Sequence, residues 1–308
     1  MSKILVIGSA NVDLVMATDR LPTHGETVFG EFSRSLGGKG ANQAVAAARA
    51  GGDVGMIACL GDDEFGTMLK RGLVAEGVRT DEVLQVEGPS GVAAIMTAAN
   101  GTNMIVVASG ANSKLEKTVI NADTFEGVDY LLLQLEIPLP TVVEAIARAT
   151  QNGVKVILDP APAAQLPRFV LERVDWLTPN ETEARTLLGL TGNDLDGIEA
   201  ARALREAGAR NVIVKLGDRG VVVLEAGGEP VVVPAMKVDV LDTTAAGDAF
   251  NGAFAVALAD GEPAVEAARI ATIAAGITVS RLGAQSSMAT RPEITTLYEM
   301  CIAAEAGV

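Results

Sequence analysis

DTTAAGDAFNG, residues 242–252, lies between a strand-like run at 238–241 and an alanine-rich helical run at 250–259. This order predicts a strand, a tight turn and a helix. Small residues in the turn would let a ligand approach the backbone N–H groups at the start of the helix, which favour negative charge. These residues are Ala245, Ala246 and Gly247. The segment therefore predicts an anion-binding turn, and ordinary helix capping by Asp or Thr is the alternative.

Asp248 follows the turn as an acidic residue in the first turn of the predicted helix. The positive end of the helix would keep its carboxylate ionised. Such a carboxylate can accept the proton of a hydroxyl that attacks a phosphoryl group, as in kinases. We therefore predict that Asp248 is a catalytic base.

A second glycine-rich segment, GGKGANQ at 37–43, opens a helical run at 41–50. It is neither a Walker A loop, because Ser33 replaces the first glycine, nor a dinucleotide motif, because Gln43 replaces the last. Lys39 and Asn42 supply donors suited to a phosphorylated or polyhydroxylated ligand. A plain glycine turn before an amphipathic helix is the alternative.

Apolar strand-like runs alternate with helical runs along most of the chain. The predicted strands are 4–7, 54–58, 130–133, 154–158 and 212–215, and the predicted helices are 63–75, 141–151, 181–188, 197–207, 249–259 and 264–279. This alternation predicts an α/β fold with a doubly wound, mostly parallel sheet flanked by helices. Three further β-rich runs, at 13–17, 26–35 and 91–107, have no helices between them and predict a separate small sheet.

Polar residues follow several of the predicted strands. They are Asn11, Asp13, Glu136, Asp159 and Gly217. Ligands of an open parallel sheet bind beyond the carboxyl ends of its strands, so we expect these residues to converge at one edge. Taken singly, each has a structural alternative, such as a turn former at Asp13, a solvated acid at Glu136 or a helix cap at Asn180.

Composition narrows the class of protein. The 308 residues carry a formal net charge of −15, which disfavours binding to the phosphate backbone of nucleic acids. Cys59, Cys301 and the single histidine, His24, do not form a zinc-binding pattern. The chain has no visible signal peptide and no apolar run of the roughly 18 residues typical of a membrane span. We expect a cytoplasmic enzyme without nucleic-acid or membrane partners.

The two glycine- and alanine-rich segments and GSANVD at 8–13 resemble the signatures of the ribokinase (PfkB) family of carbohydrate kinases. The resemblance covers nearly the whole length. It includes PTHGET at 22–27, QLE at 134–136, DPAPA at 159–163, PNETE at 179–183 and KLGDRG at 215–220. It implies one domain over residues 1–308, in which a β lid from about 13–36 and 90–108 covers the sugar site and pairs with a second copy in a homodimer.

The implied reaction is transfer of the γ-phosphoryl group of ATP to the 5-hydroxyl of D-ribose, with Mg²⁺ and activation by K⁺. Within the same fold, the alternative is a kinase of fructose, deoxyribose, 2-keto-3-deoxygluconate or a nucleoside. A sugar-binding protein that has lost catalysis is a third interpretation. Intact Asp248 and the small-residue turn argue against that third interpretation.

The resemblance also implies three groups of site residues besides the turn. The sugar group is Asn11, Asp13, Gly38, Lys39, Asn42, Ala93, Ile95, Glu136 and Asp248. The nucleotide group is Asn180, Glu183, Lys215, Gly217, Gly220, Gly247 and Thr272, with Asn180 and Glu183 in an N-x-x-E motif linked to Mg²⁺. The monovalent-cation group is Asp242, Thr244, Thr278, Arg281, Gly283 and Ser287. Thr272 and Lys215 depart from the family pattern, which usually has a larger polar residue and a hydroxyl residue there.

Overall fold

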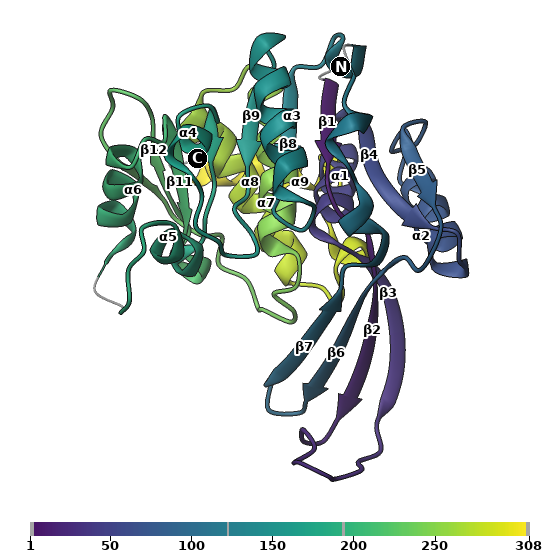
Figure 1. Ribbon diagram of the computed structural model, residues 1–308. Coiled ribbons are helices and arrows are strands. Elements are labelled where there is room, and N and C mark those ends of the chain that lie inside the picture. The colour runs from purple at the N-terminus through teal and green to yellow at the C-terminus, as the bar shows by residue number, and fades with distance from the viewer. Residues whose placement is uncertain (1–2, 122, 193–194, 306–308) are drawn as a thin grey trace.

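The computed structural model describes residues 3–121, 123–192 and 195–305, which form a large and a small β-sheet with helices around the large one (Figure 1). The nine strands of the large sheet lie in the order β13-β12-β11-β10-β9-β8-β1-β4-β5 within these residues. Their bounds are β1 (Lys3–Ile7), β4 (Asp53–Gly61), β5 (Val83–Val86), β8 (Tyr130–Leu133), β9 (Lys155–Leu158), β10 (Trp176–Leu177), β11 (Asn211–Lys215), β12 (Val221–Leu224) and β13 (Val231–Val233). All neighbours pair in parallel except β11 with β12 and β12 with β13.

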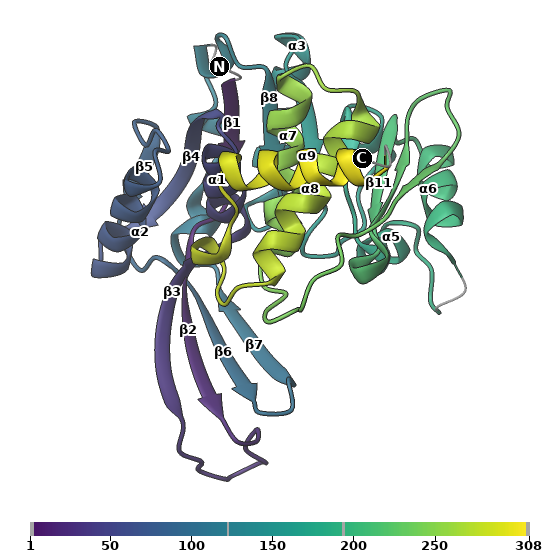
Figure 2. The same cartoon turned by 180° about the vertical axis from the view of Figure 1, so that it is seen from behind.

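Helices cover both faces of this sheet, as the opposite views of Figures 1 and 2 show. The first face carries α1 (Lys39–Arg49), α2 (Glu64–Ala75), α7 (Ala246–Ala259), α8 (Ala264–Val279) and α9 (Arg291–Glu305). The second carries α3 (Leu139–Gln151), α4 (Arg168–Leu171), α5 (Glu181–Leu187) and α6 (Gly197–Glu206). Strand β1 illustrates the alternation, because Ile4 and Val6 lie in one core while Leu5 and Ile7 lie in the other. The predicted doubly wound fold is confirmed.

Close packing of α1 on α7 connects the fold to the site. A Cβ atom on Gly252 of α7 would lie 2.6 Å from Cβ of Ala46 and 2.7 Å from N of Ala47 in α1. Only glycine therefore lets the two helices approach this closely. Two residues further along α7, Phe254 is fully buried and packs edge to face on Trp176, with ring centroids 5.2 Å apart.

The second sheet extends away from the body of the molecule (Figures 1 and 2). Its four strands lie in the order β3-β2-β6-β7. Their bounds are β2 (Asn11–Thr18), β3 (Glu31–Gly37), β6 (Gly91–Ala98) and β7 (Asn103–Ala108). Strand β2 follows β1 after three residues, so this sheet begins at the carboxyl edge of the large sheet.

One predicted strand segment is wrong and another is correct only in part. Residues 238–241 are irregular: Leu241 is 63% exposed, and its N–H and that of Asp242 both donate to the carbonyl oxygen of Val279 at the end of α8. Branched side chains favour strands only where a neighbouring strand can pair, and the described chain places none there. In the run 26–35, only the part from Glu31 onward forms a strand. No helix in the part of the chain that the structure describes is both long and apolar enough to span a bilayer.

Candidate active site

The turn before α7 has the backbone of an anion-binding site. Ala245 adopts a left-handed conformation with φ of 60°, and it is the one non-glycine residue with positive φ in the described part of the chain. An alanine in this region costs about 1–2 kcal/mol relative to ordinary backbone, and such strain is typical of functional turns. Among the described residues, no side chain caps the N-terminus of α7. The N–H group of Ala246 donates to the carbonyl oxygen of Thr243 at 3.3 Å. The N–H groups that follow it in the first turn are available to an anionic ligand.

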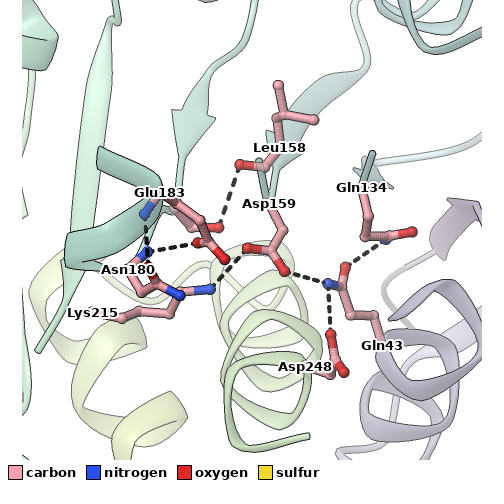
Figure 3. A network of polar contacts seen from close by, with 9 residues as sticks. Gln43, Gln134, Leu158, Asp159, Asn180, Glu183, Lys215 and Asp248 are labelled. Carbon is pink, nitrogen blue, oxygen red and sulfur yellow. Dashed lines mark hydrogen bonds and ion pairs between the residues drawn. The ribbon is translucent and has the colours of Figure 1, made fainter. Parts of the chain in front are cut away.

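Asp248 lies in the first turn of α7 and is buried. Its Oδ2 accepts a hydrogen bond of 3.0 Å from Nδ2 of Asn42, and its Oδ1 accepts one of 3.1 Å from Nε2 of Gln43. Figure 3 shows the Gln43 contact. Burial raises the pKa of Asp248 above its usual value, against the opposing effects of Lys39 and the two amides. The carboxylate is thus both held in one orientation and made more basic.

Acidic side chains surround the space in front of Asp248. Glu136 Oε2 accepts hydrogen bonds from Ser9 Oγ at 2.5 Å and from the backbone N of Lys39 at 3.0 Å. Burial, followed by repulsion from Glu136 and Asp248, raises the pKa of Asp13 to about 7. Burial lowers the pKa of Lys39, but the surrounding carboxylates outweigh it and raise the pKa above its ordinary value. The cluster combines acceptors for hydroxyl groups with one cation.

The remaining predicted sugar residues lie around this cluster. Asn11 Oδ1 accepts a hydrogen bond of 2.7 Å from Nδ2 of Asn112. Gly38 has a φ of 86°, and a Cβ there would lie 2.7 Å from N of Asn11. Ala93 pairs with Asp13 across β2 and β6, and Ile95 lies two residues further along the same face. The structure therefore brings the sugar group together at the junction of the two sheets.

Most of the predicted nucleotide residues lie at or after the ends of β10 and β11, whereas Gly247 and Thr272 lie in α7 and α8. Lys215, at the end of β11, forms a 2.9 Å ion pair with Oδ1 of Asp159 after β9 (Figure 3). Asn180 and Glu183 form a capping box on α5, so the alternative of a helix cap is observed at Asn180. Burial, followed by repulsion from Asp159, raises the pKa of Glu183.

The turn after β11 depends on two of the predicted nucleotide glycines. Gly217 and Gly220 have φ of 64° and 92°, and a Cβ on Gly220 would lie 2.1 Å from O of Val233. Thr272 is buried in α8, where its hydroxyl donates to the carbonyl oxygen of Ala268 at 2.8 Å. That hydroxyl is therefore already engaged within its own helix.

Asp242 joins the two loops of the predicted cation group. Its Oδ1 accepts from N of Thr244 and its Oδ2 from N of Gly283, both at 2.9 Å. These hydrogen bonds outweigh burial and lower the pKa of Asp242. The hydroxyls of Thr278 and Ser287 donate to the carbonyl oxygens of Ala274 and Ala284, and Arg281 pairs with Glu293. The group can thus offer a carboxylate and backbone oxygens, the donor type that hard cations prefer.

Several residues of the site were missed as site residues by the sequence analysis. Asp159 was expected at the edge of the sheet, but no role was assigned to it, and Gln43 was noted only as a mismatch to a glycine pattern. Gln134, Asn112 and Gln285 also contact the site, Gln285 through a 3.2 Å hydrogen bond from its Nε2 to Oδ1 of Asn42. Each of these three donates to another side-chain amide of the site, and only the fold brings the two amides together.

The chain matches the model of the pfkB family of carbohydrate kinases over residues 1–291. The chain belongs to the pfkB family. It is 43% identical over 301 residues to a ribokinase of Bacillus subtilis, which covers 96% of this chain and 99% of the relative. It is 39% identical over 290 residues to a deoxyribokinase of Salmonella typhi, covering 92% of this chain and 94% of the relative.

A solved pfkB-related structure has the same fold. The ribokinase of Arabidopsis thaliana, solved in complex with ribose and ATP, superposes with a TM-score of 0.89 at 32% identity, covering 97% of this chain and 99% of that chain. The resemblance drawn from the two sequence signatures is therefore confirmed, and this pfkB protein is a sugar kinase.

Asp13→Asn tests the electrostatics of the acidic cluster. Between about pH 4 and 7, the folded protein holds a proton on Asp13 that the unfolded chain has lost, so stability from this group falls as pH rises through that window. Asn should therefore increase the free energy of unfolding by about 1–3 kcal/mol at pH 8 and by much less at pH 4.

Urea unfolding at the two pH values measures this difference. Asp19→Asn, at an exposed carboxylate just beyond the end of β2, is the control and should change stability by less than about 0.5 kcal/mol. An Asp13→Asn protein that gains no stability at pH 8 would contradict the electrostatic account.

Proposed function

We propose that this chain transfers the γ-phosphoryl group of ATP to the 5-hydroxyl of D-ribose, giving ribose 5-phosphate and ADP. The observation that carries the proposal is a buried carboxylate, Asp248, directly behind an uncapped helix N-terminus and beside a cluster of hydroxyl acceptors. The similarity to ribokinases, one of them solved with ribose and ATP, supports this choice of substrates.

In the proposed mechanism, the oxygen of the sugar 5-hydroxyl attacks the γ-phosphorus of ATP, and Asp248 accepts the proton of that hydroxyl. The bond from that phosphorus to the bridging oxygen breaks, and ADP leaves. N–H groups of Ala245, Ala246 and Gly247 stabilise the charge on the transferring group. Asn180 and Glu183 would hold Mg²⁺, which supplies neutralisation of the phosphate charge.

The small sheet acts as a lid in this proposal, contributed by about 13–36 and 90–108 within one domain. Asn11, Asp13 and Glu136 accept hydrogen bonds from the sugar hydroxyls, and Ala93 and Ile95 pack on the ring. Enclosure of the hydroxyl excludes water, which limits wasteful hydrolysis of ATP. The position of Asp13 on β2, across from Ala93 on β6, supports this arrangement.

Deoxyribose is the second candidate acceptor, because a deoxyribokinase is 39% identical to this chain. The two sugars differ by the 2-hydroxyl. A buried acceptor that loses its hydroxyl partner is left unsatisfied, which makes discrimination against the deoxy sugar large when a site is built for ribose. Buried Asp13 is an acceptor of this kind.

Coupled ADP release tests the proposal on D-ribose, 2-deoxyribose, fructose, 2-keto-3-deoxygluconate and adenosine with Mg²⁺, ATP and K⁺. Ribose should give the highest kcat/KM. Asp248→Asn should lower kcat with ribose by at least about 10³-fold while the far-UV circular dichroism stays unchanged. Asp81→Asn, at an exposed carboxylate, is the control and should behave as wild type.

The outcomes separate the alternatives. Preference for another acceptor keeps the mechanism and overturns the ribose assignment. A folded wild type that is silent on the whole panel favours the catalytically silent sugar-binding protein. Retention of most of kcat by Asp248→Asn contradicts its assignment as the base.

K⁺ is proposed to bind the group of Asp242, Thr244, Thr278, Arg281, Gly283 and Ser287 and to order the adjoining turn. Asp242 supports this, because it joins the loop at Gly283 to the segment that leads into the anion-binding turn. Replacing K⁺ with tetramethylammonium should lower kcat about five- to tenfold, a coupling of about 1 kcal/mol. Steady-state rates at constant ionic strength measure it, and equal rates in the two salts would remove the idea.

A homodimer through the lid is also proposed. On the face opposite Asp13, strand register aligns Phe32, Met16, Met96 and Met104 in one apolar row. Phe32 is 63% exposed and Met104 is 53% exposed. Large apolar side chains grouped on an exposed surface are typical of a protein–protein contact. A second copy of the same row would cover it through a two-fold contact.

The double variant Phe32→Lys/Met104→Lys should therefore shift the protein to a monomer in size-exclusion chromatography with light scattering, because two cations would face their copies across the contact. Met300→Lys, at an apolar residue of α9 that is 61% exposed, is the matched control and should leave the dimer intact. A wild-type monomer at micromolar concentration would contradict the dimer.

The compartment is proposed from cysteine chemistry. Cys59 and Cys301 are both free thiols. Unpaired thiols are typical of reducing compartments, which supports a cytoplasmic location.

A further inference from the structure

Gln43 connects the base to a second carboxylate. Its side chain is fully buried on α1, and its Nε2 donates to Oδ1 of Asp248 at 3.1 Å and to Oδ2 of Asp159 at 3.0 Å (Figure 3). An amide nitrogen carries two hydrogens, so each carboxylate receives one of them. Gln43 thus uses its full donor capacity on two acidic groups.

Gln134 fixes which way the Gln43 amide points. Its Nε2 donates to Oε1 of Gln43 at 2.6 Å, just after β8. A reversed Gln43 amide would place its oxygen against two carboxylates and its nitrogen against a donor. Gly8 makes room for this arrangement, since a Cβ there would lie 2.2 Å from Oε1 of Gln134. The amide orientation is therefore set by its surroundings.

Lys215 neutralises the second carboxylate. The Asp159–Lys215 ion pair is almost buried, with 2% and 14% of the two side chains exposed. Lys215 also reaches the turn, because its Nζ lies 3.3 Å from the position that a Cβ on Gly247 would take. A series of polar contacts thus runs from the predicted nucleotide side to the base, through Lys215, Asp159, Gln43 and Asp248.

We propose that Gln43 is a positioning residue for Asp248, holding Oδ1 of the carboxylate and tying it to the Asp159–Lys215 ion pair. The inference rests on the proposed function, since it takes Asp248 as the base. Asn42, the preceding residue on α1, holds the other oxygen, so the two amides together hold the carboxylate in one orientation. Removal of Gln43 frees one oxygen and leaves it without a donor.

Several charges act on Asp248, and the effect of Gln43 adds to theirs. They are Lys39 from α1, Asp159 after β9 and Asp13 from β2, with Glu136 and Glu183 near Lys39 and Lys215 behind Asp159. A hydrogen bond to the ionised form favours that form, so its loss should make the carboxylate harder to ionise. A residue with only a structural role would not move the pH dependence of kcat.

Gln43→Met is the first test, because it keeps the length of the side chain and removes its polar atoms. In the ADP-release assay, kcat should fall about 10–100-fold, with KM for ribose within about threefold. The acidic limb of the kcat–pH profile should move up by about one pH unit. Gln85→Met, at an exposed glutamine of β5, is the matched control.

Asp159→Asn is the second test. It leaves Lys215 without its carboxylate partner, so a loss of stability is expected, and its kcat is read only after far-UV circular dichroism shows that the variant is folded. It keeps an acceptor for Gln43 and removes a negative charge that repels Asp248, so the acidic limb should move to lower pH. Wild-type kcat and pH profile in Gln43→Met, or an unmoved acidic limb in Asp159→Asn, would overturn the inference while leaving ribose phosphorylation intact. A wild type silent on every acceptor would instead overturn both.

Discussion

Contact between α1 and α7 is the constraint on which the site depends. Gly252 lets α7 approach the backbone of α1, and Asp248 lies four residues earlier on the same helix. At that separation, two consecutive residues of α1, Asn42 and Gln43, reach one oxygen each of the carboxylate. A larger residue at 252 would push the helices apart and break both hydrogen bonds together. Helix packing therefore sets the orientation of the Asp248 carboxylate.

The carboxyl ends of the strands supply further residues to this arrangement. The parallel strands β8, β9 and β11 end at one edge, so residues that follow or end them meet the start of α1 and α7 there. Buried charges at such an edge are costly unless they are paired or hydrogen-bonded. Buried Asp159 and Asp248 meet this condition through Lys215 and two side-chain amides, and half-buried Glu136 accepts a backbone N–H. The two apolar cores hold these groups in place against their mutual repulsion.

Much of the architecture could be predicted from the sequence, because strand and helix patterns are local. The signals at 37–43 and 242–252 are local too, since small residues and a glycine-rich turn predict that a ligand approaches the backbone closely. Residues 238–241 failed because a branched run carries the same signal with or without a pairing partner. Gln43 and Gln134 were missed for a related reason. Gln43 contacts Asp248 and Gln134, which lie 205 and 91 positions away from it, and nothing local shows which polar group an amide will face.

Lys215 departs from the family pattern, and its ion pair with Asp159 gives a physical reason for the departure. In the sequence it only replaces the hydroxyl residue that is common there, whereas the structure pairs it with Asp159, 56 positions earlier. Removing one member of a buried ion pair leaves an uncompensated charge, at a cost of about 3–5 kcal/mol. Neither residue can therefore change alone without loss of stability. Because Asp159 also shares Gln43 with Asp248, an unpaired Asp159 would place its charge one amide away from the proposed base, so the identity of residue 215 is coupled to the electrostatics at residue 248.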